Sequence, residues 1–288
     1  MNDLFKLIRP HHYIKNLFIL MPVFFAGELN DLNQFLRASV AFVAFSIAAS
    51  AIYVFNDYFD TEEDRLHPTK KLRPLASGAV SMRTGLILAC VLAIAGTLLM
   101  AALSLQALAV LGFYLALNVG YSLHLKHVAI IDVTIISIGL VMRLFVGSVV
   151  TSTPLSSWIV IMTFLLALFI ALAKRRDDTL LFLNTGKKMR KVIDGYNLQL
   201  IDGAMSIMAS VVIVAYLLYT TSTAIIQRLQ TEHVYLTTLF VIIGVMRYLQ
   251  ITFVQLESGS PTRIVIRDRF LQVTILAWAL SFVWIIYL

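Results

Sequence analysis

Residues 56–64 read Asn-Asp-Tyr-Phe-Asp-Thr-Glu-Glu-Asp, and they directly follow an apolar run over residues 38–55. Nine residues further on, Arg73 closes a short basic stretch that begins at Lys70. Carboxylates at the end of a membrane helix are costly to keep, and the commonest reason to keep them is a divalent metal or a polyphosphate. The stretch therefore predicts a membrane helix that delivers acidic side chains to a site for phosphate chemistry.

The composition predicts an all-α integral membrane protein. Of the 288 residues, 59% are hydrophobic and 14% are charged, and the mean hydropathy is +0.85. Apolar runs predict nine membrane helices, the first of them short, over 17–26, 38–55, 84–103, 105–123, 128–150, 157–173, 203–226, 234–254 and 269–288. No linker or low-complexity segment interrupts them, so we expect residues 1–288 to form one domain. The first run lacks a small-residue cleavage site and is expected to be retained.

The basic residues predict the orientation. Most of the 23 Lys and Arg fall before the first run or in the connections that lie on the same side as the N-terminus. Because Lys and Arg accumulate on cytoplasmic loops, the N-terminus and the acidic motif are both expected at the cytoplasmic face of the plasma membrane. The net charge of +7 then belongs to that face, and no nucleic-acid partner is expected.

The motif also predicts a metal site. If the helix continues through residue 64, a turn of about 100° per residue brings four side chains into an arc of roughly 100°, facing one cavity: Asn56, Asp57, Asp60 and Asp64. Hard oxygen donors at this density suit Mg²⁺, which is normally completed by waters and substrate phosphate oxygens. The alternative is a solvated helix end whose acids pair with nearby cations, which explains the charges but not their one-sided spacing.

The basic stretch after the motif predicts an anionic substrate. Lys70, Lys71 and Arg73 lie on a proline-bounded loop, and an arginine can hold a phosphate through two parallel hydrogen bonds. The alternative is that these cations only fix the topology, and for Lys71 this alternative is favoured.

Polar residues elsewhere extend the predicted site. Tyr121, Ser122 and Lys126 lie at the end of the fourth predicted helix, over 105–123, and Asp132 opens the next. They are expected to wall the same cavity, unless they serve only as an interfacial anchor. Arg143 lies well inside an apolar run and needs a partner, which a carboxylate, a helix carbonyl or a lipid phosphate would supply.

A second basic cluster ends the helix predicted over 157–173. Lys174, Arg175 and Arg176 complement the negative end of that helix, and Lys174 and Arg175 are also candidate phosphate contacts. Arg247 is expected to be structural or to extend toward the membrane surface. The run 187–191 is expected to bind anionic lipid headgroups.

The chain resembles the UbiA superfamily of intramembrane prenyltransferases through Asn-Asp-x-x-Asp-x-x-x-Asp at 56–64, Arg73-Pro74 and Ala76-Ser77-Gly78. Further stretches resemble one branch, the polyprenyl-phosphate phosphoribosyltransferases: Arg9-Pro10, Lys15-Asn16, His67-Pro68-Thr69-Lys70, Tyr121-Ser122, Leu125-Lys126, Asp132-Val133, Arg143, Gly147 and Lys174-Arg175-Arg176. The resemblance implies a nine-helix bundle that transfers the phosphoribosyl group of 5-phosphoribosyl-1-diphosphate to a polyprenyl phosphate with Mg²⁺, in cell-wall biosynthesis. A homo-oligomer is possible.

The resemblance also implies roles for individual residues. The predicted magnesium ligands are Asn56, Asp60 and Asp64, and the predicted catalytic residues are Asp57, Asp60 and Asp64. The predicted substrate-binding residues are Lys15, Lys70, Arg73, Tyr121, Lys126, Asp132, Arg143, Lys174 and Arg175. Because a lipid phosphate is already an anion at neutral pH, no general base is required.

One departure from the superfamily pattern bears on the choice of substrate. Many members that use a prenyl diphosphate carry a second Asp-x-x-x-Asp motif after the sixth helix, and this chain lacks it, because its acids at 177, 178, 194 and 202 are spaced differently. Two alternatives stay open. One is an aromatic prenyltransferase of quinone or haem synthesis, which would share the first motif. The other is a transporter or lipid flippase, against which the gathering of the acids at one surface counts.

Overall fold

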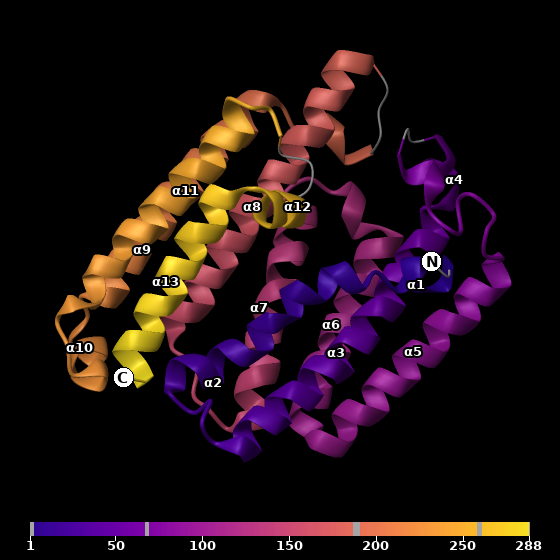
Figure 1. The fold of residues 1–288 in the computed structure, drawn as a ribbon. Coiled ribbons are helices and arrows are strands. Elements are labelled where there is room, and N and C mark those ends of the chain that lie inside the picture. The colour runs from indigo at the N-terminus through magenta and orange to yellow at the C-terminus, as the bar shows by residue number, and fades with distance from the viewer. Residues whose placement is uncertain (1–2, 67–68, 187–190, 258–260, 288) are drawn as a thin grey trace. The chain divides into compact units, whose positions relative to one another are not determined.

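A computed structural model describes residues 3–66, 69–186, 191–257 and 261–287, and every regular element within these ranges is a helix (Figure 1). The chain divides into two compact units, Met1–Leu155 and Ser156–Leu288. The single domain expected over residues 1–288 stays a prediction. Residues 67 and 68 of the predicted basic motif, and 187–190 of the predicted lipid-binding run, lie outside the described residues.

The first unit is built around one long helix. Its elements are α1 (Asp3–Ile8), η1 (Pro10–Leu20), α2 (Met21–Ala26), α3 (Leu32–Phe59), α4 (Thr61–Leu66), η2 (Lys70–Leu72), α5 (Met82–Leu103), α6 (Leu105–Leu123), η3 (Leu125–His127) and α7 (Ile131–Thr151). Helix α3 packs along α5 and also contacts η1, α6 and α7. A methyl group added to Gly96 of α5 would lie 2.8 Å from the Ala44 carbonyl oxygen, so small residues let these two backbones approach closely.

The segment before α3 differs from the predicted short helix over 17–26. Residues 10–20 form the 3₁₀ helix η1 and only Met21–Ala26 are α-helical. Pro10 begins η1 and Pro22 is the second residue of α2. Because proline lacks a backbone N–H, Pro22 prevents one continuous α-helix across the two pieces. Gly147 of α7 meets η1 so closely that any Cβ there would overlap the Ile19 carbonyl oxygen.

In the second unit, each long helix packs against the next long helix along the chain. Its elements are α8 (Ser157–Thr185), η4 (Lys191–Gly195), α9 (Leu198–Thr220), α10 (Thr223–Leu229), η5 (His233–Thr237), α11 (Thr238–Phe253), α12 (Pro261–Arg267) and α13 (Arg269–Tyr287). Helix α8 packs on α9, and α11 contacts both α9 and α13. Inside the unit, the Tyr216 hydroxyl hydrogen-bonds the Thr237 hydroxyl at 2.7 Å and accepts from the Trp278 indole at 2.8 Å.

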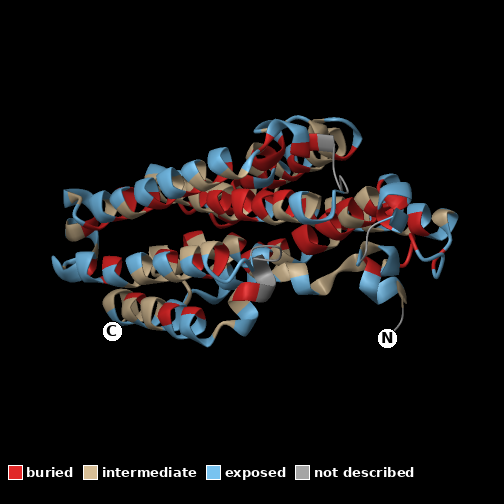
Figure 2. Ribbon diagram, turned by 90° about the horizontal axis from the view of Figure 1, so that it is seen from above, coloured by how far each residue is buried: buried red, intermediate tan, exposed pale blue. Residues whose placement is uncertain are grey.

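Eight helices in the described residues are long and apolar enough to span a membrane, which confirms the predicted multi-pass membrane protein. Helix α3 is 61% buried in its most apolar window and α5 only 17%, so α3 forms the core of the first unit and α5 exposes most of its apolar surface. Exposed stretches run along many of the helices in Figure 2, as expected for surfaces that face lipid. The count of nine membrane helices and the cytoplasmic N-terminus stay predictions.

Candidate active site

The Asp motif lies where α3 passes into α4. Asp60 ends α3, and its backbone N–H donates to the Asn56 carbonyl at 2.9 Å, while the Asp64 N–H donates to the Asp60 carbonyl at 2.8 Å. The Thr61 hydroxyl donates to the Asp57 carbonyl at 2.8 Å. The helical path therefore continues nearly unbroken through residue 64, as the spacing argument requires.

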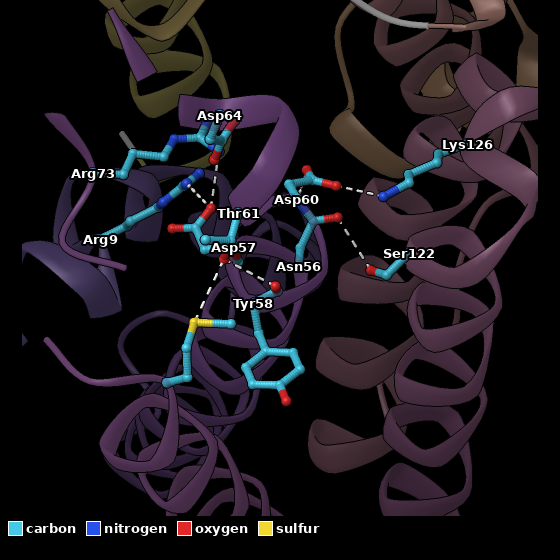
Figure 3. Close-up of polar contacts among 11 residues, drawn as sticks. Arg9, Asn56, Asp57, Tyr58, Asp60, Thr61, Asp64, Arg73, Ser122 and Lys126 are labelled. Atoms are coloured by element: carbon cyan, nitrogen blue, oxygen red, sulfur yellow. Dashed lines mark hydrogen bonds and ion pairs between the residues drawn. The ribbon is translucent and has the colours of Figure 1, made fainter. Parts of the chain in front are cut away.

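The four polar side chains of the motif form two pairs, which face different partners (Figure 3). Asn56 and Asp60 occupy one half of the predicted arc, and Asp57 and Asp64, which are seven residues or two turns apart, occupy the other. We predicted that all four side chains face one cavity, whereas in the structure the two pairs face different partners. The arc exists, but cations from elsewhere in the chain bind its two halves separately.

The first pair contacts the end of α6 and the short helix η3. The Lys126 ammonium donates to Asp60 Oδ1, and the Asn56 side-chain amide donates to Asp60 Oδ2 at 2.7 Å. The Ser122 hydroxyl donates to Asn56 Oδ1 at 3.2 Å. Lys126 and Asp60 are each 8% exposed. The structure thus brings together two residues of the motif and two residues that were predicted to wall its cavity.

The second pair is bound by two arginines. Nη1 of Arg73 lies 2.9 Å from Asp57 Oδ1 and 2.6 Å from Asp64 Oδ2, and Nη2 of Arg9 lies 2.5 Å from the same oxygen of Asp57. Asp57 is 2% exposed. Burial raises the pKa of the Asp64 carboxyl above its ordinary value, although the neighbouring Arg73 acts to lower that pKa.

Arg9 is a contact of the motif that residue spacing did not predict. It joins α1 to η1 in the left-handed backbone region (φ 52°), and its guanidinium lies 5.8 Å from the centre of the Tyr53 ring. The one signal for it in the sequence was the Arg9-Pro10 pair among the family-like stretches. Arg9 lies 48 residues before Asp57, so this contact depends on the tertiary fold.

Arg143 finds its partners inside the first unit. Its Nε donates to Asn16 Oδ1 at 2.7 Å and its Nη1 donates to the Gly139 carbonyl, while the Phe45 and Tyr114 rings lie 4.7 Å and 5.2 Å from the guanidinium. Of the partners expected for this intramembrane cation, the structure supplies the helix carbonyl, and it adds an amide oxygen and two aromatic faces. The predicted substrate role of Arg143 stays a prediction.

The remaining candidates of the first unit lie on elements around the motif. Lys15 is exposed on η1, and Lys70 lies on η2, from which its charge acts on Asp64. Tyr121 is partly buried next to Ser122 in α6, and Asp132 is fully buried in the first turn of α7. Their predicted substrate contacts stay predictions.

In the second unit, arginines pair with two aspartates, Asp178 and Asp202, for which no role was predicted from the sequence. Arg175, which is 1% exposed, donates to Asp178 at 2.6 Å. Arg176 donates to Asp202 at 2.7 Å and to the Thr252 carbonyl at 2.9 Å. The predicted phosphate contact of Arg175 therefore competes with a buried carboxylate. Lys174 is exposed on α8 beside them. Because α8 continues to Thr185, this basic cluster lies within the helix, and the prediction that it ends the helix is wrong.

A last ion pair of the second unit joins Arg247 of α11 to Asp268 at 2.6 Å. This contact agrees with the structural role expected for Arg247.

The motif provides oxygen donors of the kind that Mg²⁺ prefers, but not a complete protein cage. Within the described residues, no three His, Cys, Asp or Glu side chains converge as a metal site of their own. Asn56 and Asp60 do converge, and Mg²⁺ is commonly bound by one or two carboxylates together with substrate phosphates. The donor chemistry fits Mg²⁺ bound together with a phosphorylated ligand. Asp64 contacts Arg73 in the other half of the arc, so the full predicted ligand set is not assembled.

Comparisons with known proteins agree on one family. Residues 17–275 match the model of the UbiA prenyltransferase family. The chain is 34% identical over 290 residues to the decaprenyl-phosphate phosphoribosyltransferase of Mycolicibacterium smegmatis, covering 96% of this chain and 90% of that protein. It is 32% identical over 296 residues to the enzyme of the same name from Corynebacterium glutamicum, covering 100% and 87%.

A solved structure shares the fold. The UbiA homolog from Archaeoglobus fulgidus bound to DMAPP and Mg²⁺ superposes with a TM-score of 0.73 at 15% identity, covering 98% of this chain and 99% of that one.

Proposed function

The chain belongs to the UbiA prenyltransferase family, and from this premise we propose that it transfers the 5-phosphoribosyl group of 5-phosphoribosyl-1-diphosphate to a polyprenyl phosphate. The observation that carries the proposal is the 34% identity over nearly the whole chain to an enzyme named for this transfer. The charges around the Asp motif support it, because they combine metal-type oxygens with cations suited to phosphate.

In the proposed reaction, the bond between ribose C1 and the diphosphate oxygen breaks, and diphosphate leaves with the electron pair. A phosphate oxygen of the lipid forms the new bond to C1. The lipid phosphate is an anion at neutral pH, so the attack needs no general base. Most of the rate is then expected from holding two anions in the correct geometry and from stabilising the leaving charge.

Residues of the first unit have distinct tasks in this proposal. Asn56 and Asp60, with Asp64 as the further predicted ligand, would hold Mg²⁺, which when bound neutralises charge on the leaving diphosphate. Ser122 orients the Asn56 amide by its hydrogen bond. Arg73 and Lys126 supply positive charge to phosphate oxygens. The Asp57 carboxylate, whose Oδ1 lies 2.9 Å from Arg73 Nη1, orients that guanidinium.

The site is proposed to open on the cytoplasmic face of the plasma membrane, where a water-soluble donor would meet a lipid-borne acceptor. The support is the distribution of Lys and Arg along the sequence, which favours that face for the motif.

A direct assay tests the proposal. The purified protein in detergent, supplied with ribose-labelled 5-phosphoribosyl diphosphate, a polyprenyl phosphate and Mg²⁺, should form a labelled lipid whose mass equals the acceptor plus one phosphoribosyl group. A chelator should abolish the product. A parallel reaction with labelled prenyl diphosphate and an aromatic acid should give none, and product in that reaction alone would instead favour the aromatic prenyltransferase.

A further inference from the structure

The three aspartates of the Asp motif are already paired with cations of the chain itself. The pairs are Arg9 with Asp57, Arg73 with Asp57 and Asp64, and Lys126 with Asp60. Three positive side chains therefore face three negative ones at contact distance. All three cations come from outside the motif, from as far as 66 residues along the chain.

This balance of charge sets what the site attracts. A cluster of carboxylates without cations would bind a divalent metal strongly, whereas a neutralised cluster repels the metal through its cations as much as it attracts it. A diphosphate that arrives alone also binds weakly, because the cations it needs already have carboxylate partners, and those carboxylates repel it. A metal and a diphosphate that arrive together bring opposite charges, so each offsets the charge added by the other.

Lys126 is the cation best suited to change partners. Its ammonium contacts Asp60 Oδ1, while the Asn56 amide occupies Oδ2, so it lies on the carboxylate that the proposed metal needs. Lysine is a compact charge on a flexible stem, and a small rotation moves it from one anion to another. Arg73 is held by two carboxylates, and Asp57 in turn is held by Arg9, so that network is more constrained.

We propose that Lys126 makes the binding of Mg²⁺ and of the diphosphate group mutually dependent, because it opposes the metal at Asp60 and transfers to the diphosphate when that group arrives. The inference rests on the proposed function for its metal and its phosphorylated donor. By linkage, the diphosphate raises the affinity for the metal by the same factor as the metal raises the affinity for the diphosphate.

Metal binding to the full-length protein in detergent tests this without any turnover. The probe is Mn²⁺ with and without inorganic diphosphate. Protein-bound Mn²⁺ is measured by equilibrium dialysis and referred to the free Mn²⁺ that remains after the Mn²⁺–diphosphate complex has been measured without protein. In the unmodified protein, diphosphate should raise the Mn²⁺ affinity by about tenfold or more, within the usual range of coupling between two sites. Inorganic diphosphate is common to both classes of donor, so the result does not depend on which group the enzyme transfers.

The variant Lys126→Met should move the two measurements in opposite directions. Mn²⁺ alone should bind about fivefold more tightly than in the unmodified protein, and the enhancement by diphosphate should fall below about threefold. Lys71→Met is the matched control, since it removes an equal charge from an exposed position on η2 and should change either value less than about twofold. Asp60→Asn should weaken Mn²⁺ binding in every background.

Three results would overturn the proposal. They are an equal or weaker affinity for Mn²⁺ alone in Lys126→Met, an undiminished enhancement by diphosphate in that variant, and no enhancement in the unmodified protein. Lys126→Gln keeps a polar side chain and serves if the methionine variant does not stay monodisperse, and the last measurement needs no variant. Failure of the labelled-transfer assay with normal Mn²⁺ coupling would refute the proposed function and leave the coupling intact.

Discussion

The charged clusters of the two units use the same residue types but connect them differently. In the first unit, Asp57 accepts from two arginines and Arg73 donates to two aspartates. In the second unit, Arg175 pairs with Asp178 one turn away on the same helix. Charges that share partners across a site can be redistributed when a ligand arrives, whereas a buried pair one turn apart on a single helix has the geometry of a structural contact. The comparison therefore supports the proposed catalytic role of the first cluster and favours a structural role for the second.

The second cluster also bears on the missing Asp-x-x-x-Asp motif. Asp178 pairs with Arg175 within α8, whereas Arg176 of α8 contacts Asp202 of α9 and the Thr252 carbonyl of α11, so this cluster joins three helices of the second unit. Their arrangement fits a donor that is bound chiefly through the first motif.

The largest expected effect comes from Asp60→Asn. Removing the charge that the proposed metal and Lys126 share should lower kcat/KM for phosphoribosyl transfer by about 10³-fold. Because the introduced amide oxygen still accepts from the buried Lys126, the melting temperature should fall less than in a variant that removes one partner of a buried ion pair altogether. The measurement is the labelled-lipid assay together with thermal unfolding in detergent. Transfer at an undiminished rate by Asp60→Asn would break the comparison, because the first cluster would then be no more catalytic than the second.

A loss of stability should follow Arg175→Met in the second unit. This change removes the guanidinium that contacts the buried Asp178 carboxylate, and breaking a buried ion pair costs about 3–5 kcal/mol. Arg175→Met with Asp178→Leu should recover much of the lost stability, because both charges of the pair are then removed from the interior. Thermal unfolding measures both variants. If Arg175→Met instead raised the KM for the donor at unchanged stability, Arg175 would be a phosphate contact, as the sequence predicted.

A smaller effect is expected from Arg9→Gln. Asp57 keeps Arg73 but loses its second arginine, so the donor site should loosen while the reaction itself continues. We expect the KM for the phosphoribosyl donor to rise about tenfold with kcat little changed, as for the loss of one hydrogen bond between charged groups. Arg9→Lys should restore part of the affinity. Equal losses of kcat and of stability in both variants would make Arg9 a structural residue only.

The smallest effect concerns pH and contrasts Asp268 with Asp64. The hydrogen bond from Arg247 lowers the pKa of Asp268, whereas burial raises that of Asp64. A lowered pKa in the folded state means that the Asp268 pair stabilises the protein above the ordinary aspartate pKa, and that this stability is lost as the pH falls through the lowered value. Asp268→Asn should therefore flatten the acid side of a plot of melting temperature against pH.

Asp64 should respond earlier in the same titration. Its raised pKa means that it takes up a proton at a higher pH than an ordinary aspartate, so the affinity for Mn²⁺ should begin to fall while the Asp268 pair is still intact. A melting temperature and a metal affinity that fall together would remove this distinction between the units.

Hydropathy predicted the long helices because apolar runs of about 20 residues are rarely found outside membrane helices. Several ends differ from the predicted ones, because polar turns extend α3 from 38–55 to Leu32–Phe59 and α8 from residue 173 to Thr185. The run predicted over 203–226 is divided between α9, which ends at Thr220, and the short helix α10. The prolines at positions 10 and 22 were visible in the sequence, but the 3₁₀ form of η1 depends on its packing against α3 and α7.

Helical geometry likewise predicted the arc of the Asp motif and the need of Arg143 for a partner. The division of the arc was not predictable from spacing, because its causes are distant in sequence. Arg9 and Lys126 lie 48 and 66 residues from the aspartates that they contact. For Arg143 the rings of Phe45 and Tyr114 contribute, and no local pattern relates them to residue 143.

The closeness of Gly147 to Ile19 extends the sensitive region of the protein beyond the charged residues. Any side chain at position 147 would push η1 away from α7. Helix η1 carries Asn16, whose side-chain oxygen accepts a hydrogen bond from Arg143. A survey of random substitutions would then rank this glycine with the aspartates, although it bears no functional group. Intolerance to substitution in this enzyme therefore marks two different requirements, and only one of them is chemical.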